Sequence, residues 1–173
     1  MSERVVIDWG SNPIAWHQWY GQNVDKDKEV LQIQSVGYVQ EWSGYLDFYL
    51  DCFDLVRLIN NPFSNNQWKE KLASIGGVYL IQNSMRGDLH VGSASGDDGI
   101  WGRWSQYAQN GQGENKVMIK NCLGDSNYKN NYIISLLHVL PKHIGNREII
   151  EYESLYKRKL GEKSVYLRYQ LIL

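Results

Sequence analysis

The sequence predicts an α+β fold in which helices flank a small central antiparallel or mixed β-sheet. Two short apolar runs, GVYLI at 77–81 and LHVGS at 89–93, are joined by about seven turn-forming residues and therefore predict a β-hairpin. The apolar run YIISLLHVL predicts a buried strand within residues 131–140, which Pro141 ends. Before and after these runs, apolar residues recur with the spacing of helices.

The residues that precede the hairpin are expected to form a β layer and two helices. Apolar and polar residues alternate in VLQIQSVGYVQ at 30–40 and in GYLDFYLD at 44–51, which is the period of a half-buried strand. The next two segments, CFDLVRLINN and NNQWKEKLASIGG, have helical spacing and end in Asn-Pro and Gly-Gly signals. Since no flexible linker follows, we expect residues 1–75 to dock as an extension on a domain formed by residues 76–173.

Three helices and a strand are expected beyond the hairpin, besides the buried strand. IWGRWSQYAQ predicts a helix that ends near Asn110, and VMIKNCLG predicts a short one over 117–124. The best helical pattern is NREIIEYESLYKRKLG, with Asn146 as cap, an acidic first turn, a basic last turn and Gly161 as stop. One face of this helix is apolar and consists of Ile149, Tyr152, Leu155, Tyr156 and Leu160. VYLRYQLIL predicts a final strand over 165–173.

The composition is that of an ordinary globular protein of 173 residues, with 43% hydrophobic and 21% charged residues. Aromatic residues make up 13%, which suits either an interaction surface or a dense core. Cys52 and Cys122 have no metal-like spacing, so we expect reduced thiols in a cytosolic protein. No apolar run approaches the roughly 18–20 residues that a membrane helix needs. We therefore expect a cytoplasmic protein without a membrane partner.

Positive charge is concentrated in the half of the chain that carries the hairpin. The whole chain has a formal net charge of −1. Residues 1–75 hold six Lys or Arg and ten Asp or Glu, a net of −4, whereas residues 76–173 hold twelve and nine, a net of +3. Contacts with a nucleic-acid backbone need positive charge only where they are made. The distribution is therefore compatible with a nucleic-acid partner for the second half.

The hairpin and the helices after it together resemble the GIY-YIG endonuclease family. GVY at 77–79 is followed ten residues later by HVG at 90–92, which is similar to the signature of that family. The arginine that follows the hairpin in the family corresponds to Arg103 in GRW, and the glutamate of the metal-binding helix corresponds to Glu153 in IIEYESLYKRKLG. The resemblance covers about residues 76–168.

Two positions depart from the family pattern. His90 stands where the family has its second tyrosine, and Arg168 stands where an asparagine is expected. If the substitutions mark decay, the chain is instead a catalytically weakened module that binds nucleic acid or protein. Retention of Tyr79, Arg103 and Glu153 together favours the enzyme.

The resemblance implies hydrolysis of phosphodiester bonds in DNA by a mechanism with a single metal ion, Mg²⁺ or Mn²⁺. Glu153 would hold the metal, and the planar guanidinium of Arg103 would bind phosphate oxygens. Tyr79 and His90 would together position and deprotonate the attacking water, and the resemblance does not decide which of them takes the proton. A phenol titrates near ~10 and an imidazole near ~6.5, so a phenol acting as base needs a lowered pKa.

Five further residues are weaker candidates for binding the substrate, and each of them can also be a packed or solvated side chain. They are Tyr107, Asn115, Lys116, Lys157 and Arg168. One small domain supplies one site, so cleavage of both strands requires a homodimer or two successive nicks. The residues do not distinguish DNA from RNA as substrate. His138 and His143 lack a neighbouring cysteine or carboxylate, so we do not interpret them as a zinc site.

Overall fold

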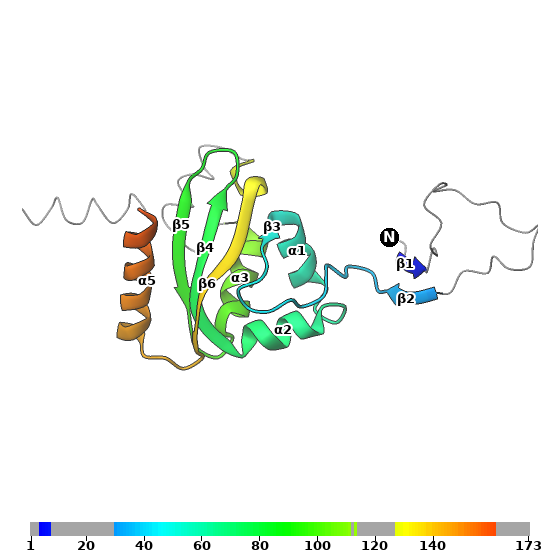
Figure 1. Cartoon of the computed structure of the whole chain (residues 1–173), viewed down its shortest axis with the longest axis horizontal. Helices are drawn as coiled ribbons and strands as arrows, with labels where there is room; N and C mark the ends of the chain where they lie inside the picture. Colours follow the sequence, from blue (N-terminus) through cyan, green and yellow to red (C-terminus); the bar gives the residue numbers. More distant parts are fainter. Residues whose placement is uncertain (1–3, 8–29, 112, 114–126, 162–173) are drawn as a thin grey trace, which may run out of the picture.

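The computed structural model describes residues 4–7, 30–111, 113 and 127–161. Its main body is a four-stranded antiparallel sheet of order β3–β6–β4–β5, with helices on both faces (Figure 1). The strands are β3 (Leu50–Asp51), β4 (Ile75–Asn83), β5 (Leu89–Ala94) and β6 (Tyr132–Pro141). The predicted α+β class, the hairpin and the inner strand are confirmed. The predicted segments 117–124 and 165–173 lie outside the described residues.

The hairpin of β4 and β5 fixes the position of Tyr79. Tyr79 pairs with Gly92 of β5, the edge strand of the sheet. On its other side β4 pairs with β6, where Val78 faces His138 but Tyr79 faces Leu136. This shift of register is a β-bulge, which increases the local twist and changes the direction of nearby side chains. Tyr79 therefore lies at an irregular point of the sheet.

Three helices cover one face of the sheet and one helix covers the other (Figure 1). The first group comprises α1 (Cys52–Asn60), α2 (Asn66–Ala73) and α3 (Gly99–Asn110), and the opposite helix is α5 (Asn146–Leu160). A short 3₁₀ helix, η1 (Tyr128–Asn131), leads into β6. Residues on either side of position 75 thus contribute to one core.

Aromatic side chains fill the core between the sheet and the first three helices. Trp68 contacts Phe48 with ring centroids 4.6 Å apart and Trp42 with centroids 4.8 Å apart, both edge to face. Trp104 also contacts Phe48. The indole nitrogen of Trp68 donates to the carbonyl of Gln40, so this buried polar atom is satisfied. These aromatic residues therefore serve packing rather than an interaction surface.

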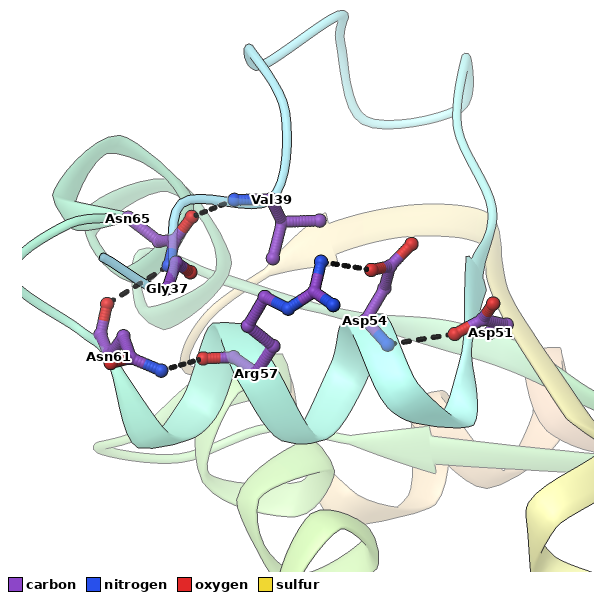
Figure 2. A network of polar contacts seen from close by, with 7 residues as sticks. All are labelled: Gly37, Val39, Asp51, Asp54, Arg57, Asn61 and Asn65. Carbon is purple, nitrogen blue, oxygen red and sulfur yellow. Dashed lines mark hydrogen bonds and ion pairs between the residues drawn. The ribbon is translucent and has the colours of Figure 1, made fainter. Parts of the chain in front are cut away.

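Asparagine and aspartate side chains hold the ends of α1 and α2 to the preceding chain (Figure 2). Asp51 caps α1, because its carboxylate accepts from the backbone N–H of Asp54 at 2.7 Å. Asn65 is 2% exposed; its Nδ2 donates to the carbonyl of Gly37, and its Oδ1 accepts from the N–H of Val39. Figure 2 shows Asn61 and Asn65 beside this segment. Residues 37–39 are therefore held by hydrogen bonds to the side chain of Asn65 and not by pairing with a β-strand.

Two predicted strands of the N-terminal part are shorter than expected. The strand expected at 30–40 ends at Gln34, and of the strand expected at 44–51 only Leu50–Asp51 pairs with β6. Gly44 has a φ of +126°, and the chain bends at residues 45–47. The alternation of apolar residues arises there because an irregular segment packs some of its side chains on the aromatic core.

The N-terminal hairpin is not the docked layer that the sequence predicts. It consists of β1 (Arg4–Ile7) and β2 (Val30–Gln34), paired antiparallel. Its described apolar side chains are all exposed, with Val5 at 55% and Ile33 at 63%. Figure 1 shows the hairpin standing apart from the four-stranded sheet. The described residues of this region that belong to the main body are instead β3, α1, α2 and the segment that contains Trp42 and Phe48.

Helix α5 has the predicted length but a different start and a narrower apolar face. Its N-cap is Gly145, and Asn146 is the first helical residue and makes no capping bond. Ile149 is buried, whereas Leu155 and Leu160 are more than a third exposed. Within the described residues, no helix has the length and apolar character needed to cross a membrane.

Candidate active site

Tyr79 reaches across the hairpin toward the edge of the sheet. A Cβ atom at Gly92 would lie 2.5 Å from Oη of Tyr79, so a residue with a side chain there would have to displace the phenol. Oη of Tyr79 lies 3.3 Å from Oη of Tyr107 on α3, and the tyrosine is only 2% exposed. The glycine of the HVG segment thus has a physical role, because it leaves room for the phenol over the edge strand.

The pKa of Tyr79 is raised well above the ordinary value of 10.0. Burial is the main cause, since it disfavours the phenolate, and the neighbouring Tyr107 adds to it. Arg103 lowers the pKa and Glu153 raises it, so both charges act on the phenol. The base that the resemblance implies needs the opposite shift. In this structure Tyr79 is a protonated phenol that can donate a hydrogen bond.

Arg103 is a half-buried residue of α3 and is held by its own helix and by the loop that follows. Its Nη1 donates to Oε1 of Gln106 at 2.9 Å and to the carbonyl of Gly113 at 3.1 Å. Within the described part of the chain, Nε and Nη2 make no hydrogen bond. A guanidinium has five N–H donors in a planar fork. One side of the fork is therefore fixed, and the other can bind an anion.

Glu153 of α5 is held at the sheet by a residue of β5. The hydroxyl of Ser93 donates to Oε2 of Glu153 at 2.5 Å, and Nζ of Lys157 lies 2.7 Å from Oε1. The side chains of Glu153 and Lys157 are 23% and 22% exposed. The carboxylate thus faces the hairpin, and each of its two oxygens has a separate partner.

The two halves of the site come from opposite faces of the sheet and meet at its edge. Successive residues of a strand point to opposite faces. Gly92 therefore adjoins the phenol of Tyr79 on the α3 side, while Ser93 bonds Glu153 on the α5 side. Among the described strands β5 lies at the edge of the sheet, so the groups on its two faces can approach each other around this strand.

A hollow of about 570 Å³ adjoins this edge. It lies among the end of β5, the first turns of α3 and the start of α5. Its polar lining consists of Ser93, Ser95, Asp97, Asp98, Arg103, Gln106 and Asn146. Volumes of this order are typical of sites for small ligands. The hollow shares Arg103 with one half of the site and Ser93 with the other.

His90 lies farther along the hairpin than the residues described so far. It pairs with Ile81 and is 8% exposed, so it is on the same sheet face as Tyr79 but two residues away from Gly92. His90 is absent from the lining of the hollow, as are Tyr79, Glu153 and Lys157, so Arg103 is the one described predicted site residue that lines it. The structure thus brings Tyr79, Arg103, Glu153 and Lys157 to one edge of the sheet. His90 is buried farther along β5, on the face of Tyr79.

The weaker candidates have different positions. Tyr107 is 4% exposed and bonds Tyr79, and Lys157 pairs with Glu153. Asn115, Lys116 and Arg168 lie outside the described residues.

Sequence reasoning missed the partners that orient the named side chains. Ser93 follows the HVG segment directly, and this adjacency is the only signal that singles it out. Gln106 lies three residues after Arg103, a helical spacing that allows contact but does not require it. The aspartates of the hollow belong to a loop that gave no motif.

The oxygen atoms around Glu153 fit a hard divalent cation. Mg²⁺ commonly binds through one or two carboxylates, with water and substrate phosphate oxygens completing its shell. Among the described residues, no three His, Cys, Asp or Glu side chains form a cage made by protein alone. The donor set suits a cation held by one carboxylate, where Mg²⁺ or Mn²⁺ would take the place of the ammonium beside Oε1.

Comparisons with family models, with curated proteins and with solved structures gave no match to this chain.

Proposed function

We propose that the protein is a metal-dependent endonuclease that hydrolyses phosphodiester bonds in DNA at the edge of β5. The observation that supports this most is the hydrogen bond between Ser93 and Glu153, two residues 60 positions apart. It holds a carboxylate beside the strand that the phenol of Tyr79 crosses, next to a hollow lined by Arg103. The guanidinium of Arg103 lines this hollow, while the phenol of Tyr79 and the carboxylate of Glu153 adjoin strand β5 beside it. Such a set of groups is suited to phosphate chemistry.

In this proposal the cationic groups bind the scissile phosphate. The free side of the Arg103 guanidinium binds two phosphate oxygens and offsets the charge that grows in the transition state. A Mg²⁺ or Mn²⁺ ion bound at Glu153 would stabilise the departing 3′ oxygen. The uncharged polar residues of the hollow, Ser93, Ser95, Gln106 and Asn146, receive the sugar and phosphate groups that flank the bond.

The attacking water is positioned by Tyr79 and gives its proton to His90. The raised pKa keeps the phenol protonated, so Tyr79 acts by hydrogen bonding and not as the base. His90 is on the same face of the hairpin.

A nicking assay on supercoiled plasmid DNA tests this function. We expect the wild-type protein to nick DNA with Mg²⁺ and not with EDTA. Glu153→Gln should lose about 100-fold or more of the activity, since even outer partners of metal ligands contribute 10–100-fold. Glu151→Gln is the matched control, because Glu151 is on the same helix in an exposed pair with Arg147. Equal activity of the wild type and Glu153→Gln would exclude the proposed role.

One observation favours the alternative of a binding module without catalysis. The ion pair with Lys157 neutralises Glu153, as a purely structural carboxylate would require. A wild-type protein that retards DNA in a gel but does not nick it at any Mg²⁺ or Mn²⁺ concentration would establish this alternative.

A further inference from the structure

We propose that Lys157 is a resident cation at the Glu153 carboxylate, which a divalent metal ion must displace, and that Ser93 is the partner that stays. This inference rests on the proposed function, since it concerns the same carboxylate. It assigns Lys157 and Ser93 as positioning residues with opposite effects on metal binding.

The ion pair of Lys157 differs from another pair on the same helix. Lys157 and Glu153 are 22% and 23% exposed, whereas Arg147 and Glu151, with the same spacing of four residues, are 95% and 66% exposed. Exposed pairs are screened by water and salt, and half-buried ones are screened less. The Lys157 ammonium therefore stabilises the negative charge of Glu153 more than Arg147 stabilises the charge of Glu151.

The two partners of Glu153 differ in their freedom to leave. Lys157 ends in a compact ammonium on a flexible four-carbon stem, so it can swing away while its helix stays in place. Ser93 has a short side chain on a paired strand, and its hydroxyl contacts the other oxygen, Oε2. Oε1 is therefore the oxygen at which a metal ion can replace the ammonium, whereas Oε2 stays bonded to Ser93 of the sheet.

Displacement of Lys157 keeps the carboxylate compensated at every stage. A half-buried carboxylate without a positive partner is unfavourable, and a metal ion that replaces the ammonium avoids that state. The released ammonium remains one helical turn from Glu153, where it can pair with a phosphate oxygen of the substrate. Lys157 thus opposes metal binding in the free protein and supports substrate binding afterwards.

Titration of the 173-residue chain with Mn²⁺ tests the inference without any nuclease activity. The electron paramagnetic resonance signal of free Mn²⁺ reports how much of the ion remains unbound. Lys157→Met should bind Mn²⁺ about two- to fivefold more tightly, since a competing ion pair of modest strength is removed. Ser93→Ala should bind about tenfold more weakly, because the carboxylate loses its outer partner. Arg147→Met is the matched control and should bind as the wild type does. Circular dichroism melts check that each variant is folded.

The outcomes separate the two levels of the proposal. If Glu153→Gln binds Mn²⁺ as tightly as the wild type, the metal site itself is wrong, and with it the proposed function. If Glu153→Gln loses the ion but folded Lys157→Met binds it no more tightly than the wild type, only the role of Lys157 is wrong. Unchanged binding by folded Ser93→Ala would likewise overturn the role of Ser93.

Discussion

The two faces of the sheet are covered in different ways. On one face, α1, α2 and α3 enclose a core in which Leu58, Leu72, Ile100 and Trp104 are completely buried. On the other face, α5 contributes a single buried residue, Ile149, to a small cluster. The positions of Tyr79 and Arg103 are set by the packing on the first face, and the position of Glu153 is set by the packing on the second. The candidate site is therefore built from one rigid half and one half whose position is set by few contacts.

Helix α5 is held on the sheet by polar and aromatic contacts rather than by a large apolar interface. The ring of His138 on β6 stacks on Tyr152, with centroids 5.0 Å apart and planes at 20°. Nδ1 of His138 lies 3.2 Å from the hydroxyl of Tyr156. Such contacts orient a helix well but bury less apolar area than the core of the opposite face does. These contacts thus fix the position of the Glu153 carboxylate, although they contribute only modestly to the stability of the protein.

Matched isoleucine substitutions on the two faces should show the largest difference. Ile100→Ala, in α3, should lower the free energy of unfolding by about 4 kcal/mol, because a closed core leaves a cavity. Ile149→Ala, in α5, should cost about 2 kcal/mol, because the small cluster beside the hollow can relax. Urea denaturation at neutral pH measures both values.

The same pair of variants also tests how the site depends on α5. Ile149→Ala should reduce nicking and Mn²⁺ affinity even where the protein is folded, since α5 carries Glu153. Ile100→Ala should leave the Mn²⁺ affinity of the folded fraction close to that of the wild type. Equal stability losses, or an undisturbed site in Ile149→Ala, would contradict the division into a rigid and an adjustable half.

Gly92→Ala should disturb the rigid half with a smaller loss of stability. The added methyl group meets Oη of Tyr79 at 2.5 Å, so the phenol must move at a cost of about 1–3 kcal/mol. Nicking should fall, while Mn²⁺ binding at Glu153 persists. Gly145→Ala serves as the control, because a Cβ atom at Gly145 meets nothing within 4 Å and its φ of −63° suits alanine. Full nicking activity of Gly92→Ala would show that the position of the phenol is unimportant.

Most of the main sheet and its helices follows from local patterns. The apolar runs at 77–81, 89–93 and 132–140 are long or β-branched enough to identify their strands, and the spacing in 146–161 identifies α5 almost to the residue. The alternation at 44–51 misled, because burial on an aromatic cluster produces the same pattern as burial in a sheet. The exposed N-terminal hairpin could not be placed, since periodicity indicates an apolar face and not what it packs against.

The sequence predicted which residues form the candidate site, but it did not predict the contacts that these residues make. Spacing and resemblance singled out Tyr79, Arg103 and Glu153, which the structure brings to one edge of the sheet. The bond from Ser93 depends on how α5 packs against β5, and no local pattern encodes that packing. The direction of the pKa shift of Tyr79 depends on complete burial beneath α3, which a motif cannot express.

Tyr79→Phe should give the smallest change in stability, and this change should vary with pH only at high pH. The pKa of Tyr79 in the folded protein is above 10.0, so between about pH 10 and that higher pKa the unfolded chain releases a proton that the folded protein retains. The free energy of unfolding of the wild type should therefore fall as pH rises above about 10, by at most about 1.4 kcal/mol per pH unit for this group. Tyr79→Phe should fall less steeply, although below pH 9 the two proteins differ only by a constant amount for the lost hydrogen bond to Tyr107. Urea denaturation of both proteins at pH 8, 9, 10 and 10.5 isolates the contribution of Tyr79, since the other tyrosines are common to both. Parallel curves across this range would mean that the phenol titrates as an exposed group, and the rigid half would then be open to water where the structure shows it closed.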